Sequence, residues 1–107
     1  MKIIASPGQV EIVEIDDFKK FHIEASGGLE QITVQFTQAG AGRILNADQA
    51  EVSISFIEQQ ASSRLQDEKW VQGLKQMLDY ALSKGWINVQ HQAVIGHIEW
   101  VEVVQLS

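Results

Sequence analysis

The order of apolar and polar positions divides the chain into three parts. Over roughly the first two thirds, apolar and polar residues alternate with a period of two, which is typical of half-buried strands. Residues 63–84 then follow the helical period, and strand character returns after them. This order predicts an α+β fold, in which an antiparallel sheet of about five strands carries one long helix, residues 63–84, on one face. The length of 107 residues corresponds to a single domain, 1–107.

A hairpin is the sharpest local prediction. Gly27 and Gly28 form a two-residue turn signal between two alternating segments. Turning the chain there puts Ile23 opposite Ile32 and sorts the apolar side chains of both segments onto one face. A slip of one residue would destroy this sorting, so the pattern predicts a hairpin over residues 19–37.

The helix and the strand before it follow from the same kind of pattern. Residues 50–56 alternate, with every second side chain up to Phe56 apolar, as in a half-buried strand. Residues 63–84 carry one broad apolar stripe. Its members are Leu65, Trp70, Val71, Leu74, Met77, Leu78, Ala81 and Leu82. Gly85 can take the left-handed position that ends a helix.

The last predicted strand, residues 94–106, carries apolar residues on both faces. One helix covers only one face of a sheet, so Val101 and Val103, on the face opposite Trp100, would be exposed. Large exposed apolar patches often mark interfaces, and two-fold dimers are the commonest oligomers. Val101 and Val103 are therefore predicted to bind a partner or to form a homodimer. The alternative is a bulge near Glu99 that turns both valines inward.

Charge and composition limit the partners. The net charge is −6, and residues 1–60 hold four basic residues against nine acidic ones. A negative field repels nucleic-acid phosphates and anionic membrane surfaces, so we expect neither nucleic acid nor a membrane as partner. The N-terminal residues lack the apolar core of a signal peptide, so the cytoplasm is the expected location. The chain has no cysteine, which excludes disulfides and thiolate chemistry.

The densest acidic stretch consists of Glu11, Glu14, Asp16 and Asp17. An acidic surface steers a basic protein toward it, so these four residues are predicted to bind a protein partner of basic character. The alternative is a solvated strand face and turn that keep the domain soluble.

Aromatic residues give a second hypothesis. Trp70, Met77 and Trp100 can line an apolar pocket between the helix and the sheet, which predicts a small-ligand site. The competing interpretation places the tryptophans in the core, because aromatic residues dominate small cores.

Histidines and carboxylates give the only metal-like pattern. His22 and Glu24 point to one side of the predicted hairpin, and His97 and Glu99 point to one side of the last strand. If those strands are neighbours, the four side chains converge on a metal site or an acid–base pair. Sequence spacing does not enforce this convergence, so we expect no metal and no cofactor.

Three function classes follow in order of preference. The first is a small, acidic, non-enzymatic interaction domain that binds another protein. The second is a small-ligand-binding domain with the apolar pocket described above. The third is an enzyme of unspecified reaction, for which the sequence offers no catalytic residues and no nucleophile motif.

Overall fold

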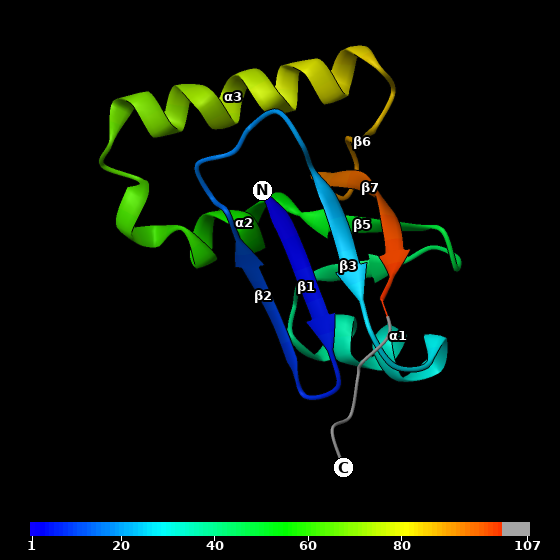
Figure 1. The fold of residues 1–107 in the computed structure, drawn as a ribbon. Coiled ribbons are helices and arrows are strands. Elements are labelled where there is room, and N and C mark those ends of the chain that lie inside the picture. The colour runs from blue at the N-terminus through cyan, green and yellow to red at the C-terminus, as the bar shows by residue number, and fades with distance from the viewer. Residues whose placement is uncertain (102–107) are drawn as a thin grey trace.

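The computed structural model describes residues 1–101 of the chain (Figure 1). Its strands are β1 (Lys2–Ser6), β2 (Gln9–Val13), β3 (His22–Ala25), β4 (Gly42–Ile44), β5 (Gln49–Ser53), β6 (Ile87–Asn88) and β7 (Ala93–Trp100). Its helices are α1 (Leu29–Gln38), α2 (Ile54–Gln60) and α3 (Glu68–Ser83), with a short 3-10 helix, η1, at Ser62–Arg64. The α+β class is as predicted. No helix within residues 1–101 is long and apolar enough to cross a membrane.

The strands form one mixed sheet. Their order is β2-β1-β3-β7-β5-β4, and β6 pairs with β7 beside this path. Strand β3 runs parallel to both of its neighbours, β1 and β7, whereas the other pairs are antiparallel. The predicted antiparallel sheet with one helix is therefore wrong. Alternation shows which face of a strand is buried, but the direction of its neighbours depends on pairing between segments far apart in the sequence.

Strand β7 joins the two halves of the sheet. Residues 93–97 pair with β5, and residues 98–100 pair with β3. Gly96 lies in the first of these stretches, and a Cβ there would lie 2.7 Å from Cδ1 of Ile23. The missing side chain lets Ile23 pack against the β7 backbone where the sheet curls. In Figure 1, β4 and β5 run across the direction of β1 and β3.

The predicted hairpin over residues 19–37 is also wrong. Its first arm is β3, but the chain then enters helix α1, and Gly28 is the residue before its first turn. Ile32 and Phe36, four residues apart, are fully buried on one side of α1. Val34, which the hairpin would have buried, is 55% exposed. The β-branched residues favour a strand locally, and the burial of one helical face against the sheet overrides that preference.

The predicted strand over residues 50–56 ends early. Strand β5 stops at Ser53, and α2 begins at the next residue. Phe56 and Ile57 are both buried, which a helix allows for adjacent residues and a strand with one covered face does not.

Helix α3 accounts for most of the predicted helix, 63–84. It begins later, because Asp67 accepts hydrogen bonds from the backbone N–H groups of Lys69 and Trp70 and so caps the first turn. It ends as predicted: Gly85 has a φ of +79°, and the N–H of Trp86 donates to the Ala81 carbonyl at 2.8 Å.

The core lies between the sheet and the three helices. Its largest fully buried side chains are Phe36, Met1, Ile3, Ile23, Ile32, Ile57, Ile98 and Val52. Helix α3 crosses one end of the sheet, opposite the end that carries α1 (Figure 1). Trp70 anchors α3 there, since its indole N–H donates to the Ile15 carbonyl at 2.9 Å.

Candidate functional site

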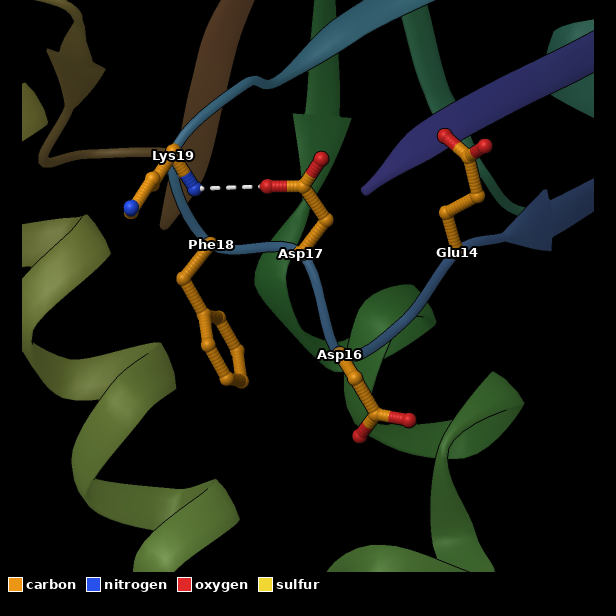
Figure 2. Close-up of a pocket in the computed structure, with 5 residues that line it drawn as sticks. All are labelled: Glu14, Asp16, Asp17, Phe18 and Lys19. Atoms are coloured by element: carbon orange, nitrogen blue, oxygen red, sulfur yellow. Dashed lines mark hydrogen bonds between the residues drawn. The ribbon is translucent and has the colours of Figure 1, made fainter.

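The loop between β2 and β3 carries the acidic residues that the sequence singled out. Glu14 has a φ of +53°, in the left-handed region, and its carbonyl accepts from the N–H of Asp17 at 3.0 Å. The Asp17 carboxylate in turn accepts from the backbone N–H of Lys19 at 3.0 Å, as Figure 2 shows. This hydrogen bond lowers the pKa of Asp17 below its ordinary value. The loop is therefore a defined turn, in which the backbone holds the Asp17 carboxylate.

An open hollow of about 650 Å³ lies on this loop. Glu14, Asp16, Asp17, Phe18 and Lys19 line it, and we call it the acidic hollow. In Figure 2, the Phe18 ring and the Asp16 carboxylate extend from the same side of the loop. Asp16 also pairs with Arg64 at 2.9 Å, with both side chains well exposed. Such an exposed pair contributes little to stability, so Asp16 stays available to another cation.

Phe18 connects the loop to α3. Its ring lies 5.7 Å from that of Trp70, in a tilted arrangement. At Gly73 of α3, a Cβ would come within 2.4 Å of the Phe18 ring. Only glycine leaves the ring this space, although glycine costs a helix interior about 1 kcal/mol relative to alanine. The glycine at position 73 of α3 therefore provides the space that the Phe18 ring occupies.

A second hollow, of about 420 Å³, shares Phe18 and Lys19 with the first. Its other lining residues are Gly73, Gln76, Met77 and Tyr80, and we call it the Phe18 groove. Tyr80 is 58% exposed, and its ring meets that of Trp86 edge-on at 6.0 Å. An acidic surface and an aromatic groove therefore meet at Phe18.

The structure sorts the predicted site residues into two groups. Glu14, Asp16 and Asp17 share the acidic hollow, and Met77 lies in the Phe18 groove. The other members lie elsewhere. Glu11 is on β2 opposite Ile4, Trp70 is buried, and Trp100 donates its indole N–H to the Ala47 carbonyl.

Of the predicted interface valines, the structure describes Val101, which directly follows β7. Val101 is exposed, and its N–H donates to the Ala25 carbonyl at 2.8 Å. Val103 and the rest of the predicted strand, 102–106, lie outside the described residues. The homodimer at this end stays a prediction.

Sequence reasoning missed Phe18 and Tyr80 as site residues. One signal was present: Gly73 interrupts an otherwise strong helical pattern, and an isolated glycine there often has a packing reason. The partner that packs on it is 55 residues away in sequence, so the pattern alone does not name it.

A buried carboxylate forms a separate cluster. Glu51 is only 4% exposed and accepts from Asn88 Nδ2 at 2.7 Å and from His91 Nδ1 at 2.9 Å. Burial acts to raise the pKa of Glu51, but the hydrogen bonds from Asn88 and His91 and the charge of Arg43 outweigh it, so the pKa is lowered. A hollow of about 300 Å³ adjoins this cluster and includes Ser53.

The cluster fixes the His91 imidazole. With Nδ1–H donated to Glu51, the neutral ring keeps Nε2 as its acceptor. The Ser53 hydroxyl, however, pairs with Ser55 Oγ at 2.8 Å. The part of the chain that the structure describes thus orients an imidazole without showing a serine hydrogen-bonded to it.

Strands β3 and β7 are neighbours, which the sequence left open. His22, Glu24 and Glu99 converge on one face of the sheet, whereas His97 is not part of that group.

Comparison with known proteins identifies no relative of this chain. The chain matches no protein family, and no curated protein or solved structure is significantly similar to it. A fold alone does not define a function, so the function must be argued from the geometry of the sites.

Proposed function

We propose that the protein is a non-enzymatic interaction domain that binds a basic segment of a partner protein. The segment lies across the acidic hollow and the Phe18 groove. The observation that carries this proposal is their common border: Phe18 and Lys19 line both. We further propose that this binding takes place in the cytoplasm, and that nucleic acid and membranes are not partners, because the net charge of −6 repels both.

Charge and apolar contact supply different parts of the binding. Glu14, Asp16 and Asp17 attract a cationic segment and orient it, which mainly raises the association rate. Affinity comes from an apolar or aromatic anchor that covers the groove beside Tyr80. A guanidinium of the partner can also stack on the Phe18 or Tyr80 ring.

The size of the site favours a segment over a whole domain surface. The two hollows, of about 650 and 420 Å³, each hold a few side chains. A short peptide segment with alternating basic and apolar residues fits both hollows, with its cations over the loop and its apolar side chains against α3.

A peptide titration tests the proposal. The probe is a short fluorescent peptide of alternating arginine and leucine, with one of alternating glutamate and leucine as its control. We expect the arginine peptide to bind, with affinity roughly fivefold weaker in a Glu14→Gln, Asp16→Asn variant, because two exposed charge pairs at about 0.5 kcal/mol each contribute about 1 kcal/mol. Tyr80→Ser should weaken binding as well, since it removes an exposed ring from the groove.

Glu30→Gln is the matched control, because Glu30 is an exposed acid on α1, which lies at the opposite end of the sheet from α3 (Figure 1). Equal binding of the two peptides, or equal effects of Glu30→Gln and of the paired variant, would argue against the proposal.

A small apolar ligand in the Phe18 groove is the second candidate. Its supporting observation is a further small hollow of about 90 Å³, which shares Phe18 and Tyr80 with the groove and is also lined by Trp86. Binding of an apolar dye that is unaffected by salt and by Glu14→Gln, but lost in Tyr80→Ser, would favour this function over the first.

A further inference from the structure

Two carboxylates lie side by side at the centre of the sheet. In the parallel pairing of β3 with β7, Glu24 is the register partner of Glu99. Register partners project from the same face, and neighbouring strands lie only about 4.8 Å apart. Ile23 and Ile98, on the opposite face, are buried in the core and hold both strands in place.

An imidazole completes the group. His22 lies two residues before Glu24 and so projects from the same face of β3. Its Nε2 lies 3.4 Å from Glu24 Oε1 and 3.8 Å from Glu99 Oε2. One donor atom from each of the three residues lies within 4.8 Å of the others. Nitrogen and carboxylate ligands of a tetrahedral zinc ion, at about 2.0–2.2 Å from the metal, lie roughly 3.3–3.6 Å apart. Small side-chain shifts therefore bring these donors to coordination distance.

A cation already sits at this group. Lys2 Nζ lies 3.1 Å from Glu24 Oε1, and Lys2 of β1 is the register partner of His22. The hydrogen bond from Lys2, followed by that from His22, lowers the pKa of Glu24. Lys2 contacts Glu24, whereas the exposed Glu99 carboxylate contacts His22.

We propose that His22, Glu24 and Glu99 form a binding site for a divalent transition-metal cation, and that Lys2 competes with the metal for Glu24. One imidazole and two carboxylates suit zinc, manganese or iron better than the all-oxygen sites of calcium and magnesium. Three protein ligands leave a further coordination position to water or to a group from another molecule. This site is independent of the proposed peptide binding, because it lies on the outer face of β3 and β7.

Titration of the metal-free protein with zinc chloride, followed by calorimetry and by the histidine ring nitrogens in NMR spectra, tests the proposal. We expect one zinc per chain and a shift of the His22 Nε2 resonance. His22→Ala and Glu99→Gln should each weaken binding by more than the roughly tenfold that loss of an outer hydrogen-bond partner costs. Lys2→Met should tighten binding, because it removes the competing ammonium.

His97→Ala and His91→Ala are the controls, since both histidines are exposed and lie outside the group. Absence of saturable binding, or binding that depends on His97 or His91 and not on His22, would overturn the site. Unchanged zinc affinity in Lys2→Met would overturn the competition. If His22→Ala fails to fold, Glu99→Gln decides alone, because the Glu99 side chain is 57% exposed and its loss does not disturb the core.

Discussion

The imidazole Nδ1 of His91 lies 2.9 Å from the Oε2 atom of Glu51, whose side chain is almost completely buried. Asn88, three residues before His91, donates to the other carboxylate oxygen at 2.7 Å. Glu51 lies in the middle of β5, while Asn88 ends β6 and His91 lies in the turn between β6 and β7. The carboxylate therefore fastens this turn to the sheet.

Removal of this carboxylate should destabilise the protein. Glu51→Ala leaves Asn88 and His91 without their acceptor, and we expect a loss of ~1–3 kcal/mol in the free energy of unfolding. Urea unfolding measures it. Glu58→Ala, at an exposed position of α2, is the control and should stay within ~0.5 kcal/mol of wild type. Equal effects of the two substitutions would show that the Glu51 contacts do not stabilise the fold.

The stability that Glu51 contributes should depend on pH. Its pKa is lower in the folded protein than the ordinary value of 4.5, so the unfolded chain binds more protons as the solution is acidified. The contribution is therefore complete above pH 4.5 and is lost as the pH falls through the folded-state value. We expect the difference in unfolding free energy between wild type and Glu51→Gln to shrink below about pH 4.5. A difference that is constant or grows on acidification would mean that the pKa shift has the opposite sign.

Gly73 and Phe18 should behave as a coupled pair. In wild type, Gly73→Ala adds a methyl group within 2.4 Å of the Phe18 ring, so the gain in helix propensity of about 1 kcal/mol should be cancelled or reversed. In a Phe18→Ala background the same substitution should show the full gain. Unfolding of the four proteins in this double-mutant cycle gives the coupling energy. A coupling energy of zero would mean that the ring does not occupy the space above Gly73.

Two substitutions on α1 distinguish this helix from the strand that the sequence predicted. Phe36→Ala should cost ~3–5 kcal/mol, because Phe36 is fully buried, whereas Val34→Ala should stay within ~0.5 kcal/mol. The predicted hairpin would have buried Val34. A large decrease in the free energy of unfolding for Val34→Ala, measured by chemical denaturation, would favour the hairpin over the helix.

The sequence could predict features that depend on neighbouring residues. The buried side of α3 and its end at Gly85 follow from helical periodicity and from the glycine conformation there. Three members of the predicted stripe are nevertheless exposed: Leu65, which lies outside α3, and Val71 and Leu82. The segment after Gly28 could not be assigned in this way, because alternation and β-branched side chains pointed to a strand. Burial of Ile32 and Phe36 against the sheet decided it, and that contact is visible only in the folded chain.

The candidate sites divide in the same way. Glu14, Asp16 and Asp17 are close in sequence, so one loop suffices to bring them into one hollow. The Phe18 groove requires α3 to pack beside that loop. The pairing of Glu24 with Glu99 requires β3 and β7 to be parallel neighbours, which no local pattern determines.

The most direct test of the proposed function is whether reversing the charge of the acidic hollow also reverses which of the two peptides the protein prefers. In Glu14→Lys, Asp16→Lys, the acidic hollow carries reversed charge at two positions, while the hydrogen bond from Lys19 to Asp17 that shapes the loop is kept. The measurement is the ratio of the dissociation constants for the arginine–leucine and glutamate–leucine peptides, by fluorescence anisotropy. We expect wild type to prefer the arginine peptide and the variant to prefer the glutamate peptide. An unchanged ratio in the folded variant would contradict binding of a basic segment at this site.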